Sequence, residues 1–460
     1  MTGILVVLAA LAALVILTYR GASLLLTAPA LAVLAVLVAE GGPLLATFTQ
    51  VFMPAAGRFI ILYFPLFLLG AVFGKLMEVS GSANVLAESL RARFGARHAI
   101  LAVVMSCALL TYGGVSLFVV AFAVWPIASV LFADARLPRV LIPATIALGA
   151  FTFTMTALPG TPAIQNAIPM PYFHTTAFAA PGLGIVASLI MLSLGWLWLE
   201  RRARSLGPEP ENAPAPRPDM EDAVARPTLL VSLLPLASVL ALNAAFAFWL
   251  IPGLDATYLA LPKYGSTDLA AVRGLWSIIA ALVLSCLVLV AIHWRNLAET
   301  LTETLENGAA DSLKPIFNTA SLVGFGAVIA SLAAFSGVRD GLLDLGGGSP
   351  LVSLALGTSL LAGLTGSASG GMSIALESLG HAYREMGLAA GVSPDLMHRV
   401  TSLATGSLDA LPHNGAVVTL LTICGLTHRE AYGDIAVVAV IVPTVALIAV
   451  IILGTVFGSF

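Results

Sequence analysis

Long apolar stretches with very few charges dominate this sequence and restrict the folds that are open to it. An α-helix needs about 20 apolar residues to cross the hydrocarbon core of a membrane. Stretches of about this length predict ten spans, at 3–19, 23–40, 58–79, 138–170, 177–199, 228–251, 273–294, 314–336, 394–425 and 432–457. The spans at 138–170 and 394–425 are interrupted. Two further apolar stretches, 98–133 and 351–387, are broken near their middles by glycine, serine and threonine.

The composition excludes a water-soluble globule. Of the 460 residues, 59% are hydrophobic and only 10% are charged, whereas soluble domains carry about 25% charged residues. A net charge of −3 without a basic tract argues against nucleic acid as a partner. Cys107, Cys286 and Cys424 lie far apart in apolar stretches, so we interpret them as buried small side chains and expect no metal and no cofactor. The sequence therefore predicts an all-α polytopic membrane protein.

A hydrophilic segment at 200–227 divides the chain into two halves, 1–199 and 228–460. Eleven of its 28 residues are charged and six are prolines, which is typical of an unfolded linker. The halves share landmarks at one offset: Gly70-Ala71-Val72 and Pro138 recur 256 residues later as Gly326-Ala327-Val328 and Pro394. We interpret this as an internal repeat.

Loop charges predict how the two halves lie in the membrane. Each half holds five spans and one broken stretch, so the second half must enter the membrane upside down. The segment 82–97 carries a net charge of +2 and its counterpart 338–350 carries −1, which favours a cytoplasmic first segment and an external second one. We therefore expect an inverted repeat with both termini outside and a cytoplasmic linker. The broken stretches become re-entrant hairpins that enter from opposite sides.

Four interruptions lie within apolar surroundings, at the two hairpin turns and in the two interrupted spans. Non-helical backbone at membrane depth is tolerated where it is buried in protein or faces a cavity. Helix ends exposed there carry partial positive charge, and the four clusters contain no lysine or arginine, so we expect a carboxylate site built from helix ends. The candidate substrate-binding residues are Thr111, Tyr112, Gly113, Gly114 and Ser116 in the first hairpin, Gly160, Thr161, Gln165 and Asn166 at the first break, Gly366, Ser367, Ser369, Gly370 and Ser373 in the second hairpin, and His413 and Asn414 at the second break. The alternative is that these small residues only pack helices together.

Two ionisable residues flank the second break. Asp409 and His413 are four residues apart, on one face if the segment is helical. A charge at membrane depth costs at least about 2.5 kcal/mol, and histidine titrates near neutral pH, so we interpret the pair as proton-coupling groups. The alternative is a structural pair that orients the broken loop. Glu377, in the second hairpin, is a less favoured candidate.

At these residues the chain resembles the gluconate permease (GntP) family of the ion transporter superfamily. The resemblance covers nearly the whole sequence: the Gly70-Ala71-Val72 segment, the hairpin glycines, the break at 158–162, the Gly366-Ser367-Ala368 turn, and Gly406-Ser407 leading to His413-Asn414-Gly415. The chain departs from the family pattern in having fewer polar residues at the first hairpin and the first break. That brings it closer to the hydroxybutyrate-permease-like branch than to gluconate carriers. Neither break carries the sodium signature of the superfamily.

The resemblance implies a homodimeric carrier in the bacterial inner membrane, with a static scaffold (3–79 and 228–336) and a transport domain that moves. We therefore expect proton symport of a small organic carboxylate resembling 3-hydroxybutyrate, by an elevator-type mechanism. Alternatives are a sugar-acid symporter, a sodium-coupled carrier, an anion channel, or an intramembrane serine protease that uses the serines at 367–369 with His413.

Overall fold

The computed structural model describes residues 2–20, 22–95, 98–115, 117–209, 227–344 and 346–460. Within these ranges all regular structure is helical and there is no strand. Seven of the helices described are long and apolar enough to cross a membrane. The prediction of an all-α polytopic membrane protein is therefore confirmed. Most of the linker, 210–226, lies outside the described residues.

The helices of the first half follow the predicted apolar stretches. They are α1 (Thr2–Tyr19), α2 (Leu24–Glu40), α3 (Leu44–Thr47), the π-helical turn η1 (Phe48–Phe52), α4 (Met53–Val79), α5 (Ser82–Phe94), α6 (Ala99–Tyr112), α7 (Leu117–Asp134), the 3₁₀ turn η3 (Arg139–Leu141), α8 (Ile142–Ala150), α9 (Phe153–Thr156), α10 (Ile164–Ala167), α11 (Pro169–Phe173) and α12 (Pro181–Leu206). The segments α3, η1 and α4 form one continuous helix, Leu44–Val79.

The second half has a similar series of helices. They are α13 (Leu229–Ala245), η4 (Phe246–Leu250), η5 (Thr257–Ala260), η6 (Pro262–Tyr264), α14 (Leu269–Ile292), α15 (Trp294–Leu297), α16 (Leu301–Ser331), α17 (Phe335–Asp344), α18 (Pro350–Thr365), α19 (Ala368–Ala389), α20 (Pro394–Leu408), α21 (Gly415–Cys424), α22 (His428–Ala436), η7 (Val437–Ile441) and α23 (Val442–Phe457).

Some boundaries differ from those predicted. The span expected at 58–79 begins at Leu44, and the span expected at 314–336 is α16, which begins thirteen residues earlier. The first half of α16 carries Glu303, Glu306, Asp311 and Lys314 among its apolar residues. A search for unbroken apolar stretches misses such an amphipathic turn. For the same reason, two segments that we expected to be loops are partly helical: α5 occupies most of 82–97, and α17 extends into 338–350.

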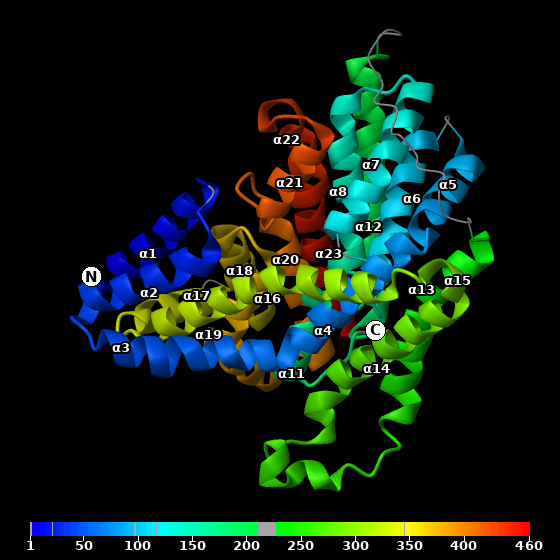
Figure 1. Cartoon of the computed structure of the whole chain (residues 1–460). Coiled ribbons are helices and arrows are strands. Elements are labelled where there is room, and N and C mark those ends of the chain that lie inside the picture. Colours follow the sequence, from blue (N-terminus) through cyan, green and yellow to red (C-terminus); the bar gives the residue numbers. More distant parts are fainter. Residues whose placement is uncertain (1, 21, 96–97, 116, 210–226, 345) are drawn as a thin grey trace.

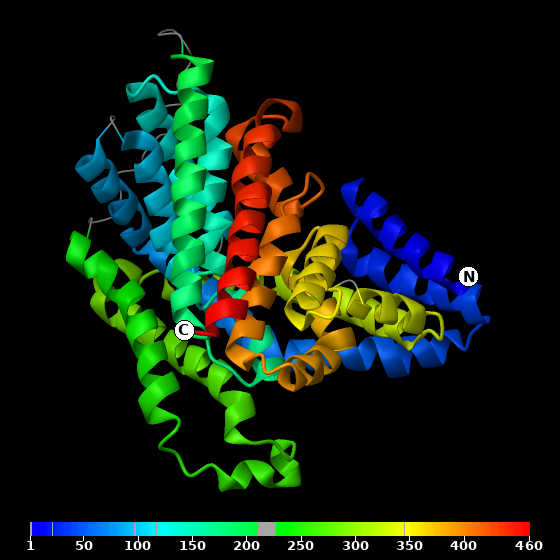
Figure 2. The same ribbon diagram turned by 180° about the vertical axis from the view of Figure 1, so that it is seen from behind.

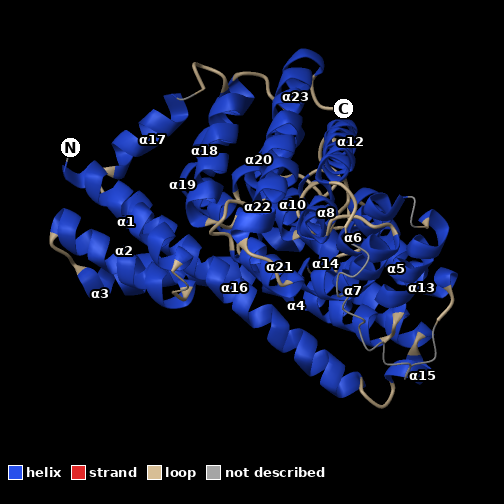
Figure 3. Ribbon diagram, turned by 90° about the horizontal axis from the view of Figure 1, so that it is seen from above, coloured by secondary structure: helices blue, strands red, loops and turns tan. Residues whose placement is uncertain are grey.

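Two long helices, the continuous Leu44–Val79 helix and α16, lie side by side at the centre of the molecule (Figures 1 and 3). Helices α1 and α2 pack together, and α2 also packs on α16. Helices α13 and α14 pack together, and α14 packs on α4. The second leading helix of each half therefore packs on the long helix of the other half.

Small residues allow the two central helices to approach closely. A Cβ atom added to Gly308 of α16 would lie 2.8 Å from the Cα atom of Val72 in α4, and one added to Gly324 would lie 3.0 Å from the ring of Phe52. Without a hydrophobic driving force between helices in lipid, such close packing supplies much of the association energy.

The remaining helices form two helical hairpins with their neighbours. Helix α6 packs on α7 and on α8, and α18 packs on α19 and on α20. Helices α12 and α23, the last of each half, run alongside each other (Figure 2). This arrangement places the interrupted segments next to the turns of the hairpins.

Candidate functional site

The first break, 157–163, is a loop with fixed backbone hydrogen bonds. Gly160 has a φ of 82°, in the left-handed region, and its N–H donates to the Ala177 carbonyl at 2.8 Å. The side-chain amide of Asn166 donates to the carbonyls of Thr161 (3.0 Å) and Ala177 (2.9 Å). A Cβ atom on residue 160 would lie 2.6 Å from the ring of Phe178. The break is therefore a defined turn that accommodates only glycine at this point.

The turn of the first hairpin lies directly against this break. The Tyr112 hydroxyl donates to the Pro159 carbonyl at 2.6 Å, and a Cβ atom on Gly114 would lie 3.0 Å from Pro162. Gly113 packs against Leu236 of α13. The Thr111 hydroxyl is buried and has no hydrogen-bond partner among the described residues. Ser116, another candidate, lies outside the described residues.

The turn of the second hairpin is organised by its serines. Gly366 ends α18 with a φ of 59°, and the Ser367 hydroxyl caps α19 by accepting from the Gly370 N–H at 3.1 Å. Ser373 donates to the Ser369 carbonyl at 2.7 Å. These residues thus fix the start of α19, where unpaired backbone N–H groups are concentrated.

The second break, 409–414, lies against that turn. The Nε2 atom of His413 lies 3.0 Å from the Gly363 carbonyl of α18, and a Cβ atom on Gly366 would lie 2.6 Å from the imidazole. Asn414 caps α21 by accepting from the Val417 N–H, and its amide donates to the Asp409 carbonyl at 2.8 Å. Helix α20 ends at Leu408, so Asp409 and His413 do not share a helix face, and His413 binds the hairpin instead.

Sequence analysis missed a buried cation, Arg399 of α20, whose side chain is fully buried. Its Nε and Nη2 atoms donate to the Ala179 carbonyl at 3.1 and 2.7 Å, and its Nη1 atom donates to the Thr156 carbonyl at 3.0 Å. Nη1 also lies 3.4 Å from the Oδ1 atom of Asn166. Arg399 therefore joins the second interrupted span to both flanks of the first break.

The neighbouring His398 extends this network. Its side chain is also fully buried. Its Nε2 atom lies 3.2 Å from the Oδ1 atom of Asn166, and its Nδ1 atom is paired with the Thr175 hydroxyl. Asn166 thus holds the first break through its amide nitrogen and faces α20 through its amide oxygen.

Arg399 is a side-chain cation that the sequence analysis, which considered helix ends alone, left out. The four clusters themselves contain none, but Arg399 stands within the span 394–425, ten residues before Asp409. The signal was present, since a lone arginine in an apolar span is costly and therefore marks a site. This signal was overlooked because a span is recognised by the average hydropathy of its residues, which one arginine changes little.

Polar side chains from the central helices and from α13 also reach the site. Asn243 of α13 is fully buried and donates to the Gly160 carbonyl at 3.1 Å. The Thr319 hydroxyl of α16 lies 3.3 Å from the Ser369 hydroxyl. The Oε1 atom of Gln165 is buried and accepts no hydrogen bond from any described residue. The site is thus contacted from outside the hairpins and broken spans.

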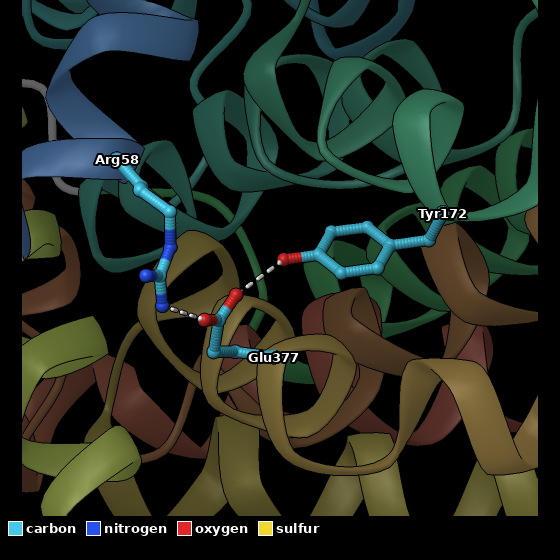
Figure 4. A network of polar contacts seen from close by, with 3 residues as sticks. All are labelled: Arg58, Tyr172 and Glu377. Carbon is cyan, nitrogen blue, oxygen red and sulfur yellow. Dashed lines mark hydrogen bonds and ion pairs between the residues drawn. The ribbon is translucent and has the colours of Figure 1, made fainter. Parts of the chain in front are cut away.

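Glu377 of α19 lies at a junction of three helices, as Figure 4 shows. Its Oε1 atom forms an ion pair with Arg58 of α4 at 2.9 Å, and its Oε2 atom accepts from the Tyr172 hydroxyl of α11 at 3.1 Å. Within the residues described, no cluster of three or more histidine, cysteine, aspartate or glutamate side chains could hold a metal ion.

Comparisons with known proteins identify relatives of this chain. No protein-family model matches the sequence. The chain is 42% identical over 476 residues to a protein of Bacillus subtilis (strain 168) described as the uncharacterized transporter YxjC, and the match spans 99% of each protein.

Two solved structures match most of the chain. MtrF of Neisseria gonorrhoeae, described with a class of antimetabolite efflux pumps, matches 91% of this chain and 85% of its own with a TM-score of 0.56 and 14% identity. The YdaH transporter of Alcanivorax borkumensis matches 88% of each chain with a TM-score of 0.47 and 17% identity. At 14% identity, MtrF supports the fold and leaves the substrate open.

Proposed function

This chain belongs to the same family of membrane transporters as Bacillus subtilis YxjC, and from that premise we propose that it carries a small hydroxymonocarboxylate across the membrane together with a proton. The proposed substrate has the size and chemistry of 3-hydroxybutyrate, and the proposed direction is uptake. Within the ion transporter superfamily, we place the chain in the GntP family, nearest its hydroxybutyrate-permease-like branch.

The buried guanidinium of Arg399 is the main observation in support of an anionic substrate. Its hydrogen bonds go to backbone carbonyls and to one amide oxygen, and none of the ion pairs found among the described residues includes it. Neutral acceptors satisfy the donors but leave the positive charge uncompensated, apart from Asp395 one turn earlier on α20. A buried charge without a close counter-ion favours an anion nearby.

Polar groups at the first break support a hydroxylated substrate. The Oε1 atom of Gln165 is a buried acceptor without a donor, and the Thr111 hydroxyl is buried without a partner among the described residues. Unsatisfied buried polar groups are costly unless a ligand or water pairs with them. A substrate hydroxyl would donate to Gln165, while helix ends and Arg399 balance the carboxylate.

We further propose that the two halves are inverted repeats and that transport proceeds by an elevator mechanism. Support comes from the order of elements: each half has two leading helices, one long central helix, one short helix, a helical hairpin, an interrupted helix and a final helix. The proposed fixed part contains α1–α4 and α13–α16. The proposed moving part contains the hairpins α6–α7 and α18–α19 with the interrupted segments.

The proposed proton carrier beside the substrate is Asp409. It follows α20 directly, and its backbone carbonyl is bound by Asn414 of the second break. A neutral Asp409 would lower the cost of moving the loaded site across the membrane, since a charge at the bilayer centre costs at least about 2.5 kcal/mol.

Counterflow in proteoliposomes tests this function. Purified protein should exchange labelled for unlabelled 3-hydroxybutyrate, and uptake should rise as external pH falls and collapse with a protonophore. Asp409→Asn should lose concentrative uptake more than exchange. Uptake that survives the protonophore but requires sodium would overturn the proton assignment, and absence of exchange for every small hydroxy acid would overturn the substrate.

A further inference from the structure

Arg58 is a cation inside a long apolar helix. Within Leu44–Val79, 14 helical residues precede it (44–57) and 21 follow it (59–79). An arginine this far from both helix ends is expensive in a membrane unless a partner compensates its charge, and such residues mark functional sites. Its partner in the structure is Glu377, at 2.9 Å.

The contact crosses the boundary between the two parts that we propose to move relative to each other. Arg58 belongs to α4, in the proposed fixed part, whereas Glu377 belongs to the second hairpin. Tyr172, which donates to the other oxygen of Glu377, follows the first break and belongs to the proposed moving part (Figure 4). The Tyr172 bond can therefore travel with the hairpin, but the Arg58 bond must break when the hairpin moves.

Few other ionisable groups lie around Glu377. On α19 itself, His381 stands one turn later and its Nδ1 atom lies 3.5 Å from the Glu385 carboxylate. On α4, the phenol of Tyr63 is buried and donates to the Ile168 carbonyl at 3.0 Å. Helices α10 and α18 contain no ionisable side chain. The contacts of α16 with α19 include Thr319, Leu322 and Gly326, which follow the charged first half of α16.

The ionisable residues of α20 are directed elsewhere. His398 pairs with Thr175 and Asn166, and Arg399 binds the flanks of the first break. Asp395 lies within electrostatic range of Arg273 and Arg399. Arg58 is therefore the charge that holds the Glu377 carboxylate.

We propose that Glu377 is a proton-operated latch of this carrier. An ionised Glu377 holds the second hairpin against α4 through Arg58. A proton taken from water by the carboxylate removes its charge, and the ion pair is lost while Tyr172 still donates to the neutral carboxyl group. The Arg58 side chain is 64% exposed, so it can turn away from the hairpin. This inference rests on the proposed proton-coupled function and makes Glu377 a positioning residue, distinct from Asp409 beside the substrate.

The latch predicts a specific pH dependence of exchange. In proteoliposomes, counterflow of 3-hydroxybutyrate by the unmodified chain should slow at least tenfold from acidic to alkaline pH, because ionised Glu377 holds the hairpin. Glu377→Gln and Arg58→Gln should each exchange at the fast rate throughout, and should accumulate less substrate under a proton gradient because movement no longer requires the proton. The matched control is Glu78→Gln, which removes an ion pair within α4 (Lys75–Glu78, 3.0 Å) and should keep the unmodified pH profile. If Glu377→Gln keeps that profile as well, the latch does not exist.

A second measurement needs no substrate and separates the latch from the proposed function. In a chain whose three cysteines are replaced, Thr319→Cys and Ser369→Cys should cross-link readily while the latch is closed, since the native hydroxyls lie 3.3 Å apart. At a given alkaline pH, adding Glu377→Gln should reduce the cross-linking yield several-fold. An unchanged yield overturns the latch. A reduced yield in a chain that exchanges no hydroxy acid supports the latch and overturns the proposed substrate.

Discussion

A guanidinium that no solvent reaches must find its acceptors inside the protein, and Arg399 takes them from residues 156–179. Those acceptors lie 220 to 243 positions away in the sequence. No local pattern predicts such a pairing, so sequence reasoning could place the break at 157–162 but not the side chain that holds it. By contrast, the capping roles of Ser367 and Asn414 follow from residue type and position, because short polar side chains before a helix accept its first N–H groups.

Replacing Arg399 tests its electrostatic role. A buried carboxylate that loses its counter-ion is destabilised by several kcal/mol, so Arg399→Gln should weaken 3-hydroxybutyrate binding at least tenfold. Arg399→Lys keeps the charge but loses the forked hydrogen bonds, and should weaken binding far less. Thermal unfolding of both variants measures the structural cost separately. Equal losses of affinity for the two variants would mean that Arg399 acts only as a structural clamp.

At the scale of helices and turns, the sequence indicated where helices are interrupted but not how far they extend. Proline and glycine indicated the positions of both breaks and of the second hairpin turn. These residues restrict or free the backbone at their own position, so their effect is local. The start of α16 was missed by thirteen residues because its first turns are amphipathic. The specific contact between Gly366 of the hairpin turn and His413 of the break depends on packing between segments, which the sequence does not show.

Gly366 tests whether this turn must keep its shape. An alanine there would occupy a left-handed conformation, which costs roughly 1–2 kcal/mol, and its methyl group would meet His413 at 2.6 Å. Gly366→Ala should lower the unfolding temperature and abolish most exchange. The control Gly341→Ala lies in α17 with open space around it and should be neutral or stabilising. Full exchange by Gly366→Ala would show that the turn tolerates another shape.

Across the whole molecule, the proposed inverted repeat makes a prediction about sidedness. In a chain without native cysteines, Ala213→Cys in the linker should react with a membrane-impermeant maleimide only after permeabilisation. Ser349→Cys, just before α18, should react in intact cells. Labelling of both from the same side would exclude inverted halves with external termini.

The proposed elevator mechanism makes a second prediction at this scale. A covalent bond between Thr319→Cys of α16 and Ser369→Cys of α19 would join the proposed fixed and moving parts where their hydroxyls lie 3.3 Å apart. Uptake should stop on oxidation and return on reduction. A cross-linked carrier that still transports at full rate would mean that the second hairpin does not move against α16.

The continuous helix Leu44–Val79 has a further consequence for the membrane around it. Its 36 residues extend about 54 Å at 1.5 Å per residue, well beyond the roughly 30 Å of a bilayer's hydrocarbon core. A helix of this length, with Pro65 inside it, fits by tilting, by kinking or by thickening the lipid near it, and each adjustment costs a fraction of a kcal/mol per Å. The tilt also sets the depth of Arg58, fifteenth along the helix. The acyl-chain length of the surrounding lipids should therefore tune the carrier's rate, with an optimum thickness on either side of which transport slows.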